Sequence, residues 1–215
     1  RLGWELLRYA FKRTGLLTTA PGNVSASLKV MPGVATPDVQ FAFAPASYVE
    51  GQLGVLDKFP GMTCGIWQHR PASRGSIHMA STDPEVQPTI RPNYLSDRID
   101  QETIVGGLRK ARELFAQPTL AKFVDVETVP GPDVQTDDEL LDFARRTGST
   151  VFHPIGTCKM GTDPMAVVDP ELRMHGLKGL RVVDASVMPL MPSANTNAAV
   201  LMIAEKAADM IKAAN

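Results

Sequence analysis

The chain has 215 residues, of which 44% are hydrophobic and 21% are charged, and its formal net charge is −1. This composition is typical of a globular protein with a sizeable core, and the balanced charge argues against a nucleic-acid partner, which needs a basic excess. The two cysteines, Cys64 and Cys158, are too few for a disulfide framework or a metal cluster. We therefore expect two thiols in a reducing, cytoplasmic compartment and no metal site, with the reactivity of Cys158 left open.

Hydrophobic periodicity predicts four helices along the chain. The first has apolar residues on one face from Leu2 to Phe11 and should end near Thr14 and Gly15. Because this pattern begins at residue 1 without a cap, we expect the sequence to start inside a longer protein. The other helices are predicted over residues 97–117, from Thr136 to about residue 146, and from within two residues of Asn197 to about Lys212.

Alternating apolar and polar residues predict strands at 39–44, 62–68 and 76–80, the last two as an antiparallel pair. The short loop between that pair carries His69, Arg70 and Arg74, which form either a solvated basic surface or an ion-pair cluster with Asp83 or Glu85. Residues 180–183 are almost wholly apolar and predict a short strand buried in a sheet. Since no other stretch matches it, we expect its partner to lie outside this chain.

Two polar stretches in the last third of the chain are the strongest candidates for a functional site. His153 follows a β-branched and aromatic run and precedes Pro154, so we expect it at a strand end; Asn195 stands just before the last helix. Each residue alone has an ordinary explanation. His153 could be a histidine whose ring is hydrogen-bonded within the fold, and Asn195 could be a helix N-cap. Together, a neutral histidine that can accept a proton and a helix N-terminus that attracts negative charge suit proton removal from an alcohol beside an electron acceptor.

The amino-acid sequence of several stretches supports a more specific interpretation. They are His153-Pro154-Ile155-Gly156-Thr157-Cys158-Lys159-Met160-Gly161, the residues 167–170, 175–189 and 195–197, and, earlier in the chain, 71–76, 83–84 and 92–95. Together they closely resemble the C-terminal part of the glucose–methanol–choline (GMC) flavin oxidoreductases, most of all the choline-dehydrogenase-like branch.

The resemblance implies FAD as cofactor and oxidation of an alcohol to an aldehyde or ketone, with the proton passing to an active-site base and a hydride to flavin N5. His153 matches the catalytic histidine of the family, and Asn195 its second active-site position. Asp184 and Ala185 match the segment that touches the FAD ribityl and pyrophosphate groups. The stretch Asn195, Thr196 and Asn197 matches the helix start that faces the flavin pyrimidine ring.

The implied fold is α+β: a substrate domain on a mostly antiparallel sheet flanked by helices, with a C-terminal strand and helix that return to a Rossmann-type FAD domain. Residues 1–150 would be the C-terminal portion of the substrate-binding domain, and 151–215 the catalytic motif and the return to the FAD domain. No glycine-rich dinucleotide fingerprint occurs in the sequence.

We therefore expect the chain to be a C-terminal, substrate-side piece whose partner is the N-terminal FAD-binding portion of the same protein. Alone it should be inactive and not a self-sufficient soluble unit. The parent enzyme would be cytoplasmic or membrane-associated without a transmembrane segment, since no apolar run approaches the ~20 residues that a spanning helix needs. The identity of the alcohol and the choice between oxidase and dehydrogenase stay open. The alternative is a non-catalytic binding or assembly domain that keeps the fold without flavin.

Overall fold

The computed structural model describes residues 2–18, 20, 22, 24–50, 52 and 54–214. Its main sheet has three antiparallel strands, β1 (Val24–Leu28), β2 (Val39–Ala44) and β3 (Thr63–Gln68), with β2 in the centre. The alternation in β2 places Val39 and Phe41 on the face that is fully removed from solvent, where they form a hydrophobic cluster with Ala111. The strands predicted at 39–44 and 62–68 are confirmed.

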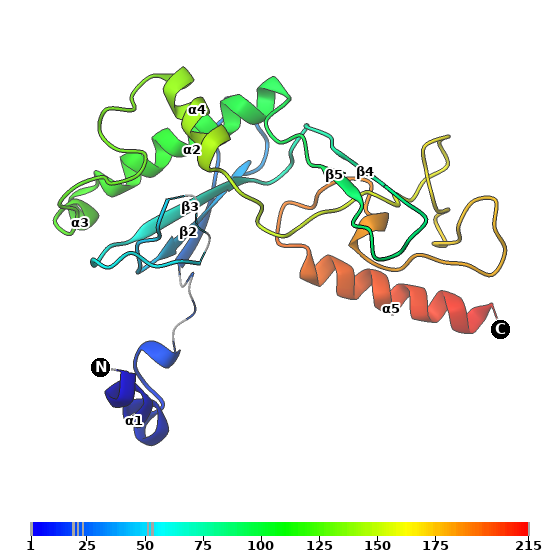
Figure 1. The fold of residues 1–215 in the computed structure, drawn as a ribbon, viewed down its shortest axis with the longest axis horizontal. Helices are drawn as coiled ribbons and strands as arrows, with labels where there is room; N and C mark the ends of the chain where they lie inside the picture. The colour runs from blue at the N-terminus through cyan, green and yellow to red at the C-terminus, as the bar shows by residue number, and fades with distance from the viewer. Residues whose placement is uncertain are drawn as a thin grey trace.

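One face of this sheet is covered by α2 (Arg98–Phe115), which is followed by the short α3 (Pro118–Ala121) (Figure 1). Asp97 caps α2 by accepting a hydrogen bond from the backbone N–H of Ile99. At Gly107 the helix comes so close to β3 that an added Cβ would lie 2.7 Å from the Ile66 side chain. A glycine is therefore needed there for α2 to pack on the sheet.

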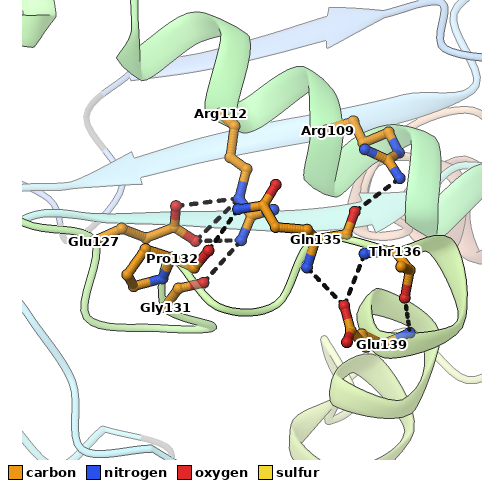
Figure 2. A network of polar contacts seen from close by, with 8 residues as sticks. All are labelled: Arg109, Arg112, Glu127, Gly131, Pro132, Gln135, Thr136 and Glu139. Atoms are coloured by element: carbon orange, nitrogen blue, oxygen red, sulfur yellow. Dashed lines mark hydrogen bonds and ion pairs between the residues drawn. The ribbon is translucent and has the colours of Figure 1, made fainter.

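The helix α4 (Asp137–Thr147) packs against α2 and begins with a reciprocal capping box between Thr136 and Glu139. The loop before it is tied to α2 by two arginines, as Figure 2 shows. Arg112 makes several hydrogen bonds to the Glu127 carboxylate, and Arg109 donates to the backbone carbonyl of Gln135. The helices predicted at 97–117 and from Thr136 are confirmed.

A separate hairpin is formed by β4 (Ser76–His78) and β5 (Thr89–Arg91), which pair with each other. The predicted pairing of residues 62–68 with 76–80 is therefore wrong. The cause is the buried Asp100 at the start of α2, whose carboxylate accepts hydrogen bonds from the backbone N–H groups of Ala72 and Ser73. These bonds hold the intervening loop on α2, and the chain leaves the main sheet before β4 begins.

The C-terminal part contains the one-turn 3-10 helix η2 (Ala185–Val187) and the long helix α5 (Asn197–Ala213). α5 lies in the part of the molecule opposite the main sheet, below the loops of residues 151–196 (Figure 1). Its start and end agree with the prediction. It packs on a second hydrophobic cluster with Ile203 and Ala207, whose other buried members are Val168, Leu172, Val187 and Met188.

Residues 180–183 are not a strand of a sheet, which corrects the sequence prediction. Arg181 forms an isolated antiparallel bridge with Arg173, and Val182 N–H donates to the Leu172 carbonyl. A turn through residues 175–179 returns the chain on itself, so this apolar segment finds its backbone partners locally. A partner strand from outside the chain is not needed for these hydrogen bonds.

At the other end of the chain, α1 (Leu2–Lys12) and the short η1 (Leu16–Thr18) stand apart from both hydrophobic clusters (Figure 1). The apolar face of α1 is open, with Trp4 69% and Phe11 82% exposed. None of the helices in the described part of the chain is both long and apolar enough to cross a membrane.

Candidate functional site

His153 lies in an irregular segment that follows α4, and the expectation that it ends a strand is wrong. Phe152, just before it, has a positive φ of 61°, and its N–H donates to the Thr150 hydroxyl at 3.0 Å. A left-handed residue interrupts an extended strand, and Pro154 has no N–H to donate to a neighbouring strand. The histidine is half-buried and directly follows a bend of the backbone at Phe152.

The stretch after His153 is hydrogen-bonded to the segment around η2. Cys158 N–H donates to the Ser186 carbonyl at 3.0 Å, and Met160 N–H donates to the Val187 carbonyl at 2.8 Å. Gly156 takes a φ of +84°, which glycine adopts without strain. Two motifs that are separated in the sequence therefore lie side by side on the second hydrophobic cluster.

Asp184 forms the N-terminal cap of η2. Its Oδ1 accepts hydrogen bonds from the N–H and the hydroxyl of Ser186, with the N–H bond at 2.7 Å. Asp184 is exposed, whereas the neighbouring Ala185 is half-buried and packs against the second cluster. The carboxylate is thus fixed at a surface position by a rigid turn.

The start of α5 brings a different set of groups to the same region. Thr196 is the N-cap residue and is only 7% exposed, while Asn195 and Asn197 on either side of it are exposed. The Thr196 hydroxyl lies 3.0 Å from Nδ1 of His153, within hydrogen-bond distance. This contact joins the two stretches that the sequence singled out. That Asn195 and His153 also meet on one substrate atom stays a prediction.

Sequence analysis missed the role of Arg70. Its guanidinium donates to the Ser193 hydroxyl at 2.7 Å and to the Thr36 hydroxyl at 2.8 Å, so it ties the loop before α5 to the main sheet. Arg74 donates to the backbone carbonyls of residues 71–73. Among the described ion pairs, neither arginine contacts Asp83 or Glu85. Since Ser193 is 123 residues away, no local pattern could have indicated this bond.

The N-terminus of α5 contributes partial positive charge to this region. Its cap residue makes no side-chain hydrogen bond to the first turn, and no acidic residue occurs in that turn. The unpaired N–H groups of a helix start carry partial positive charge and suit an anion or developing negative charge. Within the part of the chain that the structure describes, no three His, Cys, Asp or Glu side chains are placed to hold a metal ion.

Comparison with known proteins decides the family. A family model described as GMC oxidoreductase matches residues 71–204, which include both motifs of the site. The chain belongs to the GMC oxidoreductase family. The matched model is that of the C-terminal region, which agrees with the sequence prediction.

Curated GMC relatives are similar over nearly the whole chain. An alcohol dehydrogenase [acceptor] of Pseudomonas putida is 43% identical over 96% of this chain and 37% of its own length. An oxygen-dependent choline dehydrogenase of Pseudomonas putida is 42% identical over 95% of this chain and 36% of its own length. The chain therefore spans little more than a third of the relatives that it matches.

Solved structures show the same fold. Pyridoxine 4-oxidase from Mesorbium loti is 30% identical, with a TM-score of 0.80 over 88% of this chain and 37% of the other. An FAD-dependent oxidoreductase from Chaetomium thermophilum is 27% identical, with a TM-score of 0.71 over 82% of this chain and 28% of the other. The helix-and-sheet arrangement, with its small antiparallel sheets, is thus that of GMC oxidoreductases, which are flavoproteins.

Proposed function

We propose that this chain is the substrate-side, C-terminal part of an FAD-dependent enzyme that oxidises an alcohol to an aldehyde or ketone. The observation that carries the proposal is the 3.0 Å contact between His153 Nδ1 and the Thr196 hydroxyl. It places the histidine beside the helix N-terminus, which is the combination of proton acceptor and positive dipole that the reaction requires. The names of the alcohol and choline dehydrogenase relatives support the choice of an alcohol substrate.

The residues present are compatible with one side of a flavin site. The first turn of α5 has no side-chain cap, so its N–H groups can serve an external acceptor such as the carbonyl oxygens of a flavin ring. Asn195 and Asn197 are exposed beside it, and the Asp184 carboxylate uses only Oδ1 for its contacts within the described chain. We assign FAD binding to Asp184, Ala185 and the stretch 195–197.

In this assignment His153 accepts the hydroxyl proton of the alcohol, and Asn195 orients the alcohol oxygen by a hydrogen bond. Bound FAD supplies the acceptor for the hydride that leaves the alcohol carbon. A positioned general base contributes about 10²–10⁴-fold to the rate of such a step. The helix dipole of α5 adds electrostatic stabilisation where negative charge gathers.

The remaining part of the flavin site belongs, in this proposal, to an N-terminal FAD-binding portion of the same protein. Support comes from the coverage, since the curated relatives are almost three times as long as the region they share with this chain. The open apolar surfaces are consistent with it, because Leu201 and Met202 on α5 are each 60% exposed.

The test uses the full-length holoenzyme and anaerobic stopped-flow measurement of flavin reduction. We expect His153→Ala to lower the reduction rate constant by about 10²–10⁴-fold. Asn195→Ala should slow reduction by less, because an orienting group does not itself take the proton. His78→Ala is the control, since His78 is exposed on the β4–β5 hairpin. An unchanged rate in His153→Ala would contradict the role as base, and a full-length protein without flavin would favour the binding-domain alternative.

A further inference from the structure

The side chain of Thr196 is not used in the way its position suggests. A threonine at a helix N-cap normally has extended backbone angles and accepts a hydrogen bond from an N–H of the first turn. Thr196 instead has helical angles, φ −73° and ψ −14°, and makes no side-chain cap hydrogen bond. Its hydroxyl is buried and directed to Nδ1 of His153 at 3.0 Å.

This contact restrains the imidazole ring. It is the one hydrogen bond of the His153 side chain among the described residues, and the ring stands on an irregular segment next to the left-handed Phe152. Thr196, in contrast, is held on a rigid element, because α5 is anchored through Ile203 and Ala207 in the second cluster. The loop before Thr196 is also fixed by the Arg70 hydrogen bond to Ser193.

We propose that Thr196 is a positioning residue whose hydroxyl occupies Nδ1 of His153, so that Nε2 is the ring nitrogen left to accept the substrate proton. A hydroxyl can accept as well as donate, and a lone pair on Nε2 of the neutral ring requires that Nδ1 carries the hydrogen and donates it to the Thr196 oxygen. The inference rests on the proposed role of His153 as base. In the neutral ring one nitrogen carries hydrogen and the other a lone pair. When Nδ1–H donates to the Thr196 oxygen, the lone pair is on Nε2, and the same bond persists after Nε2 has taken the proton.

The variants Thr196→Val and Thr196→Ser test this in the full-length holoenzyme. Valine keeps the shape of the side chain and removes the hydroxyl, whereas serine keeps the hydroxyl. Loss of the partner that orients a metal-ligating histidine typically costs about 10–100-fold in activity, and we expect a similar factor for a histidine base. We expect Thr196→Val to lower the limiting rate constant of flavin reduction by this factor with little change in the apparent substrate affinity, and Thr196→Ser to restore most of the rate.

Thr103→Val is the matched control. Thr103 is also buried, and its hydroxyl donates to the Ile99 carbonyl at 2.7 Å within α2, away from His153. We expect this variant to reduce flavin at the wild-type rate. Equal effects of Thr103→Val and Thr196→Val would show a general loss of packing and would overturn the proposal. An unchanged rate of flavin reduction in His153→Ala would contradict the proposed function. A large effect of His153→Ala without an effect of Thr196→Val would contradict only the role of Thr196.

A second readout does not depend on turnover. Nitrogen chemical shifts of 15N-labelled histidine distinguish the two neutral tautomers, and His153→Gln identifies the signal of His153. At a pH where the ring is neutral, the wild-type holoenzyme should show hydrogen on Nδ1, and Thr196→Val should show a mixture or hydrogen on Nε2. Hydrogen on Nε2 in the wild type would overturn the inference even if every Thr196 variant failed to fold.

Discussion

Asp100 is expected to be the most sensitive single position for the placement of the loop that separates the main sheet from the β4–β5 hairpin. Its side chain is 2% exposed, and Oδ1 accepts from Gln68 Nε2 at 2.6 Å and from Ala72 N–H at 2.8 Å. Oδ2 accepts from Ser73 N–H at 2.7 Å. Burial alone would raise the pKa of Asp100, but these hydrogen bonds, with one from the Ser73 hydroxyl, hold the pKa below its ordinary value.

Asp100→Asn keeps the shape of the side chain and replaces one acceptor oxygen by an N–H₂ group. If the amide oxygen keeps the two partners of Oδ1, the N–H₂ group faces Ser73 N–H, and a buried donor loses its acceptor at a cost of about 1–3 kcal/mol. The two remaining hydrogen bonds lose their charge assistance, which is worth about 1 kcal/mol more. We therefore expect a local destabilisation of about 2–4 kcal/mol.

Hydrogen exchange followed by mass spectrometry on the full-length holoenzyme measures this directly at Ala72 and Ser73. A loss of about 2 kcal/mol in the free energy of local opening corresponds to roughly 30-fold faster exchange of these amides. Asp97→Asn is the control, because Asp97 is an exposed helix cap and asparagine caps equally well. Equal exchange of the 72–73 amides in the two variants would refute the assignment of Asp100 as the anchor.

The difference in local stability between wild type and Asp100→Asn should depend on pH in a defined direction. Because the folded-state pKa of Asp100 is lowered, its stabilisation is fully present above the unfolded-state pKa of about 3.9 and is lost as the pH falls through the folded-state value. The gap between wild type and Asp100→Asn should therefore be constant from neutral pH down to about 5 and should narrow below about 4.

Two further predictions concern the same part of the molecule. Arg112→Lys should destabilise the 127–131 loop by about 1–2 kcal/mol, because lysine cannot reproduce the fork that contacts Glu127 and the Gly131 carbonyl (Figure 2). Faster hydrogen exchange in this loop should show the effect. Arg98→Lys is the control and should have almost no effect, because the Arg98 side chain is 88% exposed. Burial raises the pKa of the Cys64 thiol to about 12, so iodoacetamide at pH 8 should alkylate Cys64 at least about 100-fold more slowly in the native than in the urea-unfolded protein. Native labelling at the unfolded rate would contradict the burial of this thiol.

Local chemistry explains the elements that sequence analysis located correctly. The helix α2 has an aspartate cap and a periodic apolar face, α4 has a capping box, and β2 begins with an alternation of buried and half-buried positions. Each of these signals lies within a few residues of the element it specifies, so it can be recognised from the sequence. The family resemblance was found in the same way, because its motifs are short and contiguous.

The errors arose where a distant group determines the local structure. Residues 62–68 and 76–80 looked like a hairpin, but Asp100 holds the loop between them on α2. Residues 180–183 looked like a strand without a partner, but the chain folds back so that Leu172 accepts a hydrogen bond from Val182. Strand pairing depends on which backbone groups meet in space, and hydrophobic pattern alone does not specify that.

In the candidate site too, some features are local in the sequence and others depend on the tertiary structure. The sequence alone indicated that His153 and the stretch Asn195, Thr196 and Asn197 carry the chemistry, since residue type and position before a helix are local properties. It singled out Asn195 as the second active-site residue and gave Thr196 only the flavin-facing role of the whole stretch. Only the tertiary structure shows which of the three residues meets His153, because the direction in which α5 leaves the second hydrophobic cluster turns Thr196 inward onto His153 and both asparagines outward. The orientation of α5 is determined by the packing of its middle, where Ile203 and Ala207 are buried.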